Sequence, residues 1–173
     1  MNLAMSDIVW NILSESTNYR QFKLIKAIFF NKNKQHNWFV PWHQDKTIAV
    51  KQKAHLAGYK NWTIKQGVSH VQPPIKILNG ITTIRIALDS NNNQNGALKI
   101  IPRSHTLGIL KQEDINCIVT QQQMQFCLLD GDILMMHPLI LHSSDRSIIH
   151  SDCRIIHLEY CSANLPQELT WHY

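Results

Sequence analysis

The chain has 173 residues, of which 44% are hydrophobic and 17% are charged, a length and composition typical of one folded domain. We therefore expect a single domain over residues 1–173. The formal net charge is +5, but the lysines are scattered rather than gathered in a dense basic run, which argues against a nucleic-acid-binding protein. No apolar run approaches the length of a membrane span, and the N-terminus lacks the features of a signal peptide. These observations predict a cytoplasmic protein without a membrane or nucleic-acid partner.

The first half of the chain predicts one helix followed by strands. Ser6 or Asp7 can cap a helix whose apolar residues recur at helical spacing, namely Ile8, Val9, Ile12 and Leu13. Apolar and β-branched runs then predict strands over 23–30, 38–42, 47–53 and 81–89, with a polar turn at 31–34.

The second half continues this pattern. A short strand is expected over 97–101 and a helix over 112–119. Two further strands, 124–129 and 133–136, flank Asp130-Gly131, the strongest hairpin signal in the chain. A last strand over 154–160 places Arg154, Ile156, Leu158 and Tyr160 on one face. About eight short strands with few helices favour an all-β sandwich or barrel over a parallel α/β sheet.

Histidine and carboxylate residues two positions apart are the first candidates for chemistry. On a strand such residues share a face, so both can bind one metal ion. A histidine from a distant strand would complete a two-histidine, one-carboxylate triad, which suits Fe(II) and leaves coordination positions open. Of three such pairs, His43 and Asp45 are favoured, because too few residues follow Asp152 or Glu159 to supply a third ligand from another pair of strands. His142, at the end of a predicted apolar strand that begins at Leu139, is the candidate third ligand.

Arg154 is the second candidate, because it opens the last predicted strand. An arginine facing inward from an apolar β face needs an anionic partner, since an unpaired buried guanidinium is costly. Two roles are open for it. It could bind an anionic ligand, or it could form a structural ion pair with a carboxylate such as Asp132 or Glu159.

Several motifs in order carry a resemblance to a known family. They are Trp42-His43-Gln44-Asp45, Asn95-Gly96-Ala97-Leu98, Ile101-Pro102-Arg103-Ser104-His105, Gly131-Asp132, His142-Ser143-Ser144 and Arg154. Together they resemble the phytanoyl-CoA dioxygenase family of Fe(II)- and 2-oxoglutarate-dependent oxygenases, over roughly residues 23–163. The resemblance implies a mainly β fold, a double-stranded β-helix (jelly roll), here with a short N-terminal helix and one inserted helix.

The resemblance also implies the site and its cofactors, which are Fe(II), 2-oxoglutarate as cosubstrate, and O₂. His43, Asp45 and His142 would be the iron ligands. Arg154 would bind the distal carboxylate of 2-oxoglutarate, Ser144 would support that carboxylate, and Arg85 would lie in the cosubstrate pocket. One departure is Arg103, which stands where the family's turn usually has glycine.

The implied function is a dioxygenase that hydroxylates a small organic substrate and releases succinate and CO₂, with no protein partner. Family halogenases replace the carboxylate ligand with a small residue so that chloride can bind, and Asp45 keeps that position filled. Two alternatives remain open. One is a cupin-like metal enzyme that does not use 2-oxoglutarate, and the other is a non-catalytic jelly-roll binding protein.

Overall fold

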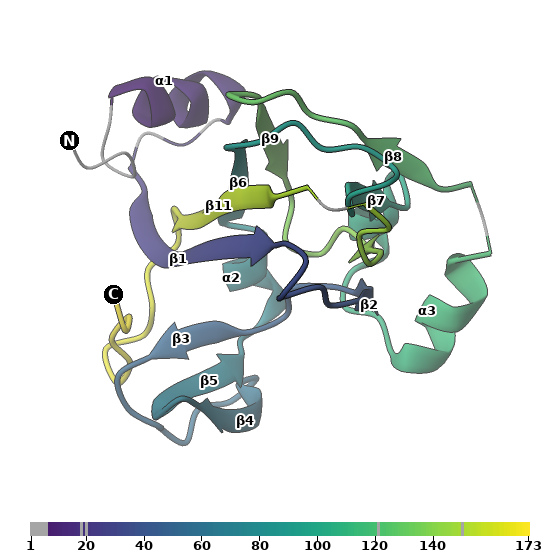
Figure 1. Ribbon diagram of the computed structural model, residues 1–173. Coiled ribbons are helices and arrows are strands. Elements are labelled where there is room, and N and C mark those ends of the chain that lie inside the picture. Colours follow the sequence, from purple (N-terminus) through teal and green to yellow (C-terminus); the bar gives the residue numbers. More distant parts are fainter. Residues whose placement is uncertain (1–6, 18, 20, 121, 150) are drawn as a thin grey trace.

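The computed structural model describes residues 7–17, 19, 21–120, 122–149 and 151–173, and three antiparallel sheets make up most of it (Figure 1). The elements in chain order are α1 (Asp7–Ser16), β1 (Lys23–Lys32), β2 (Val40–His43), β3 (Ile48–Val50), β4 (Lys60–Lys65), β5 (Val68–Gln72), α2 (Ile75–Leu78), β6 (Ile81–Ala87), β7 (Leu98–Ile100), a 3₁₀ turn (Ser104–Leu107), α3 (Gln112–Ile118), β8 (Met124–Phe126), β9 (Ile133–Met136), β10 (His142–Ser144) and β11 (Cys153–Cys161).

Two four-stranded sheets form the body of the fold. Their strand orders are β1-β11-β6-β9 and β2-β10-β7-β8, and every pairing is antiparallel. Residues from both sheets line one cavity, so the sheets face each other as in a jelly roll. The mainly β fold is therefore as predicted from the strand pattern.

Strand β11 is buried on both of its faces, and this decides which side chains reach the cavity. Ile156, Leu158 and Tyr160 pack with Val9 and Leu13 of α1 in a core outside the cavity. The alternate residues Cys153, Ile155 and His157 line the cavity. The predicted first helix is thus confirmed, and its buried residues cover the outer face of the β1-β11-β6-β9 sheet (Figure 1). Ser6, one of its two candidate caps, lies outside the described residues.

The predicted hairpin at Asp130-Gly131 is wrong. A turn does form there, because the Asp132 amide donates to the Leu129 carbonyl at 3.1 Å and Gly131 has a φ of +87°. However, β8 pairs with β7 in one sheet and β9 pairs with β6 in the other. The turn is therefore a corner between sheets, since a local turn signal does not determine which strands pair.

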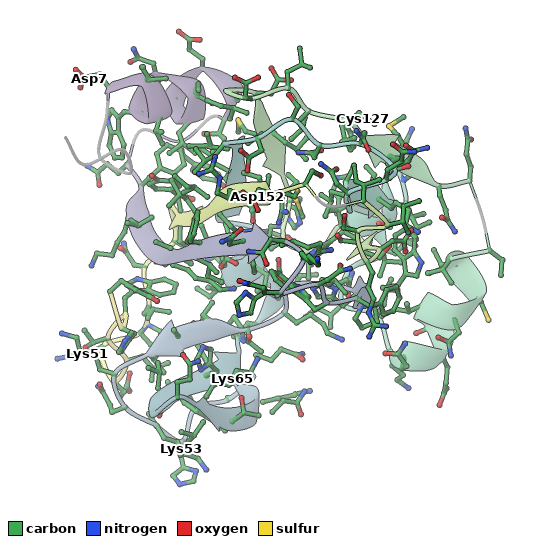
Figure 2. All side chains as sticks on the ribbon, viewed as in Figure 1. Asp7, Lys51, Lys53, Lys65, Cys127 and Asp152 are labelled. Atoms are coloured by element: carbon green, nitrogen blue, oxygen red, sulfur yellow. The ribbon has the colours of Figure 1, made fainter. Side chains whose placement is uncertain are left out.

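A separate three-stranded sheet, with the order β3-β5-β4, lies beside the main body (Figure 1). The sequence analysis missed β4, β5 and α2, because β4 is exposed along most of its length and lacks clear alternation. Figure 2 shows Lys51, Lys53 and Lys65 around this sheet, on the opposite side of the molecule from α1. Within the described part of the chain, no helix has the length and apolar character needed to cross a membrane.

Candidate metal centre

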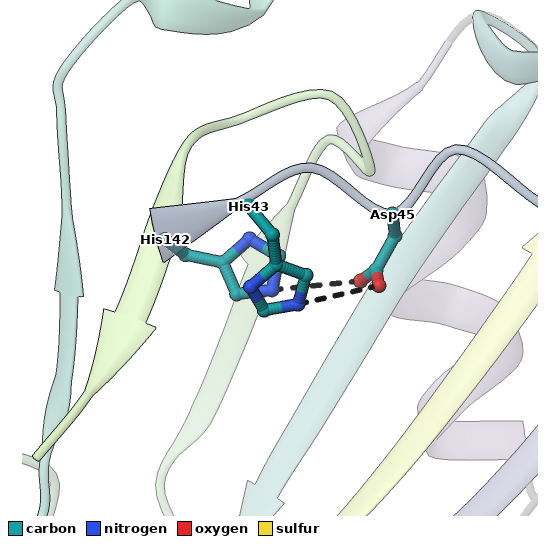
Figure 3. Close-up of side chains that lie close together, drawn as sticks. All are labelled: His43, Asp45 and His142. Atoms are coloured by element: carbon teal, nitrogen blue, oxygen red, sulfur yellow. Dashed lines mark ion pairs between the residues drawn. The ribbon is translucent and has the colours of Figure 1, made fainter. Parts of the chain in front are cut away.

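His43, Asp45 and His142 come together at the cavity, as the sequence predicted (Figure 3). His43 ends β2 and His142 begins β10, and the two residues are partners in the antiparallel register. Asp45 lies two residues beyond His43, where its amide donates to the Pro138 carbonyl at 2.9 Å. Asp45 Oδ1 is 3.8 Å from His43 Nε2, and Asp45 Oδ2 is 3.6 Å from His142 Nε2. One potential ligand atom from each residue lies within 4.8 Å of the other two.

Backbone carbonyls orient both imidazoles in the same way. His43 Nδ1 lies 2.8 Å from the Pro41 carbonyl oxygen, and His142 Nδ1 lies 2.9 Å from the Ile140 carbonyl oxygen. A carbonyl only accepts, so each Nδ1 carries the proton and each Nε2 lone pair is directed toward Asp45. A carbonyl that holds the outer nitrogen of a ligand histidine is the usual support of a metal site.

The charge states of His142 and Asp45 also suit a metal ion. Burial lowers the pKa of His142 to about 4, against the opposing charge of Asp45, so this imidazole is neutral at pH 7. Burial alone would raise the pKa of Asp45, but the charges of His142 and Lys26 outweigh it and lower that pKa. A neutral imidazole and a carboxylate are the forms that bind metal. The side chain of His43 is 38% exposed and that of His142 only 5%.

The cavity beside this cluster has a volume of about 220 Å³. Apolar side chains from β1 and β11 form much of its wall, among them Ile28, Phe30 and Ile155. Cationic side chains share that wall, namely Lys26, Lys32 and Arg85. A space with this lining suits a small anion held next to the metal ligands.

A buried polar chain fixes Arg85, which lines the cavity where the family resemblance placed it. Arg85 Nη1 donates to His157 Nδ1 at 3.3 Å, so His157 carries its proton on Nε2 and donates to Glu159 Oε1 at 3.1 Å. Lys26 Nζ lies 2.7 Å from the same Glu159 oxygen. Asp45, His157 and Glu159 also lie close enough to form a second cluster of possible ligands, but the Lys26 ammonium already neutralises Glu159.

Arg154 is not in the cavity, and the role predicted for it has to be corrected. Its side chain is 46% exposed and forms a two-point ion pair with Asp89, with Nε–Oδ2 and Nη2–Oδ1 distances of 2.8 and 2.6 Å. The alternation of β11 explains this, because Cys153 and Ile155 point into the cavity and Arg154 between them points out. Arg154 thus forms a structural ion pair, with Asp89 rather than Asp132 or Glu159.

Ser144 does line the cavity, and it has a partner that the sequence analysis missed. Its hydroxyl donates to the Gly96 carbonyl at 2.7 Å and accepts from Lys32 Nζ at 2.7 Å. The predicted polar turn at 31–34 is wrong at Lys32, because β1 continues through it. The signal was the alternation Lys26, Ile28, Phe30, Lys32, which places all four side chains on one face.

The sequence profile of the phytanoyl-CoA dioxygenase family matches residues 2–148. The chain belongs to the phytanoyl-CoA dioxygenase family. No curated protein gives a significant match to the chain.

Solved structures show the same fold at low sequence identity. AviO1 from Streptomyces viridochromogenes Tue57 is 17% identical, with a TM-score of 0.66 over 95% of this chain and 62% of that chain. HygX from Streptomyces hygroscopicus, with nickel, 2-oxoglutarate and hygromycin B bound, is 13% identical, with a TM-score of 0.62 over 95% of this chain and 65% of that one. SnoK, a non-heme alpha-ketoglutarate-dependent carbocyclase from nogalamycin biosynthesis, is 14% identical, with a TM-score of 0.57 over 87% of this chain and 52% of that one. The chain therefore spans less than two thirds of each of these proteins.

Proposed function

We propose that the protein is an Fe(II)- and 2-oxoglutarate-dependent dioxygenase that hydroxylates a small organic substrate. The observation that carries this proposal is the cluster of His43, Asp45 and His142, with both Nε2 atoms directed at one carboxylate. Three ligands on one side of a metal leave positions for a cosubstrate and O₂. Bound there, Fe(II) would couple oxidative decarboxylation of 2-oxoglutarate to oxidation of the substrate.

The cavity supports the choice of cosubstrate. 2-Oxoglutarate carries two negative charges, and the wall beside the metal ligands carries the half-buried guanidinium of Arg85 and the hydroxyl of Ser144. Because His157 and Phe30 hold Arg85 in place, this cation needs no reorganisation to meet an anion. The apolar side chains around it would exclude water from the reacting centre.

Hydroxylation is the reaction that we propose for this protein. The solved structures that resemble the chain include an epimerase and a carbocyclase. Asp45 occupies the position that a halide would need, which favours oxygen transfer over halogenation. We propose a small molecule as the substrate, as in HygX with hygromycin B bound. The product should then contain one oxygen atom from O₂, and the second should appear in succinate.

The first test is binding under anaerobic conditions. Wild-type protein with Fe(II) and 2-oxoglutarate should develop the visible charge-transfer absorption of an Fe(II)–2-oxo acid chelate. His43→Ala and Asp45→Ala should abolish it. His55→Ala removes an exposed histidine away from the cavity and should leave the absorption unchanged.

The second test is turnover on admission of O₂. Succinate should form only in the presence of iron, and isotopic oxygen should appear in it. Iron binding of normal affinity in the double variant His43→Ala, Asp45→Ala would contradict the metal assignment. Iron binding without any 2-oxoglutarate chelate would instead favour the alternative of a metal enzyme that does not use this cosubstrate.

One observation favours that alternative, namely the outward position of Arg154. If no other cation served the distal carboxylate, the cavity would lack the charge that 2-oxoglutarate needs at its far end. The question is therefore whether another residue of this chain supplies that charge.

A further inference from the structure

Lys32 is a buried cation at the end of the cavity wall formed by β1. Its side chain is part of that wall, and the residue is only 4% exposed. Its ammonium donates to Ser144 Oγ at 2.7 Å and to the Asp145 carbonyl at 2.6 Å, and it lies 5.5 Å from the centre of the Trp38 ring. All three neighbours are neutral groups.

Among the described residues, no carboxylate pairs with Lys32. The carboxylate of Asp145, whose backbone carbonyl accepts from Lys32, binds Lys99 at 2.7 Å instead. An ammonium has three N–H donors, and within the part of the chain that the structure describes only two of those of Lys32 have acceptors. A buried cation without a counter-ion is costly, and burial accordingly lowers the pKa of Lys32. The third donor and the uncompensated charge point to an anionic ligand.

The position of Lys32 along the wall fits the far end of 2-oxoglutarate. Ser144 lies two residues beyond His142 on β10, and both face the cavity. Two residues of a strand cover about 7 Å, so Ser144 and the Lys32 ammonium bound to it lie roughly that far along β10 from His142. A five-carbon dicarboxylate that chelates the metal through its 2-oxo acid end extends over a similar distance.

Arg85 is placed differently, nearer to the metal ligands. Its guanidinium contacts His157, which offers a ring nitrogen within 4.8 Å of an Asp45 carboxylate oxygen. Its guanidinium is held by His157 and lies 5.7 Å from the centre of the Phe30 ring. Arg85 is therefore suited to the middle of the cavity, and Lys32 to its far end.

The strand register shows why a lysine from β1 can replace an arginine from β11. Lys32 pairs with Cys153, which is the residue of β11 that points into the cavity beside Arg154. At this end β11 brings a thiol to the cavity and turns its cation outward. Gly96 provides the space for the ammonium, because a Cβ there would lie 2.8 Å from Lys32 Nζ.

We infer that Lys32 supplies the charge that binds the distal carboxylate of 2-oxoglutarate, with Ser144 holding its ammonium. This inference rests on the proposed function. It supplies the cation that the cavity would otherwise lack because Arg154 points outward. The residue that binds the far end of the cosubstrate would then lie on β1 instead of on β11.

The test is calorimetric titration of protein loaded with Mn(II), a redox-silent stand-in for Fe(II). Each protein is titrated with 2-oxoglutarate and with 2-oxopentanoate, which has the same chelating end but no distal carboxylate. Lys32→Met should weaken 2-oxoglutarate binding by about 10²-fold, because it removes one partner of a buried charge pair. Its affinities for 2-oxopentanoate and for Mn(II) should not change. The matched control Arg154→Met removes one positive charge outside the cavity and should bind 2-oxoglutarate like the wild type.

Three outcomes would overturn the inference while leaving the proposed function intact. They are unchanged 2-oxoglutarate affinity in Lys32→Met, an equal loss for both oxo acids, and loss of affinity in Arg154→Met. If wild-type protein bound Mn(II) but not 2-oxoglutarate, the proposed function would fail, and this inference with it. If Lys32→Met lost Mn(II) binding, Lys32→Gln, which keeps a donor for Ser144, would be judged by the same criteria.

Discussion

His43 and His142 face each other across two antiparallel strands, with their ring centres 4.2 Å apart and Asp45 within 4 Å of both Nε2 atoms. Neighbouring strands bring these imidazoles together although 98 residues lie between them in the sequence. The pairing of β2 with β10 therefore brings the two imidazoles together, and Asp45 follows in the connection two residues beyond the end of β2.

Metal binding should stabilise the folded protein through this cluster. A divalent ion at 100 times its dissociation constant contributes about 2.7 kcal/mol to the free energy of unfolding. Asp45→Ala should abolish this gain while leaving the protein without metal folded, because Asp45 contributes to the site more than to a core. Thermal unfolding with and without Mn(II) measures both effects. An unchanged metal-induced shift in Asp45→Ala would exclude Asp45 as a ligand.

Arg103 adopts a left-handed conformation, with φ of +63°, at the position where the family usually has glycine. The turn is thus retained, and the side chain bears a steric cost of about 1–2 kcal/mol. Arg103→Gly should raise the free energy of unfolding by about 1 kcal/mol once the greater freedom of glycine in the unfolded chain is deducted. Arg103→Ala removes the same charge but keeps Cβ, so it should not stabilise. Equal stabilities of the two variants in urea denaturation would contradict this explanation.

Gly96→Ala should lower the free energy of unfolding by about 2 kcal/mol. Gly96 has φ of +88°, and a Cβ there would lie 2.8 Å from both the Asp145 carbonyl oxygen and Lys32 Nζ. Shortening the lysine in the double variant Gly96→Ala, Lys32→Ala relieves only the second contact. The two substitutions should therefore be non-additive in a double-mutant cycle of urea denaturation, whereas strict additivity would mean that they do not meet.

His137 should make the protein less stable below neutral pH. Burial and the charge of His105 lower its pKa from 6.5 to about 4, and its Nδ1 accepts a hydrogen bond from the Leu139 amide at 3.1 Å. Between these two pKa values the unfolded chain binds more protons than the folded one, so stability falls as pH decreases from 6.5 to 4. Because His137 is only half-buried, the loss should be no more than about 1–2 kcal/mol. In His137→Gln, the midpoint of urea denaturation should depend less on pH than in the wild type. An unchanged dependence would mean that another group causes the loss of stability.

Much of the fold could be predicted because local patterns determine it. The spacing of Val9 and Leu13 gave α1, and β-branched runs gave β1, β6 and β11 close to their observed bounds. Pairing could not be predicted in the same way. The Asp130-Gly131 turn is real, but β8 and β9 find their partners in different sheets through contacts distant in sequence.

In the functional site, too, local sequence patterns could be predicted and long-range packing could not. The two-residue spacing of His43 and Asp45 predicted that both could bind one metal ion, and the structure places both beside His142. Arg154 was assigned to the correct face of β11 together with Ile156 and Leu158, but that face packs on α1. A strand buried on both sides offers two apolar faces, and its sequence does not show which one borders the cavity. Lys32 was missed for a related reason, because its surroundings in sequence are those of a surface turn.

The unequal exposure of the two imidazoles gives the centre an open side and a sealed side. A metal ion held there would be backed by β10, which buries His142, and would meet solvent beside β2, where His43 is partly exposed. Exchange with a chelator would then begin at His43, with His142 the last protein ligand to release. The lifetime of the bound ion should accordingly depend on how firmly the end of β2 is held in its sheet, even where the equilibrium affinity does not.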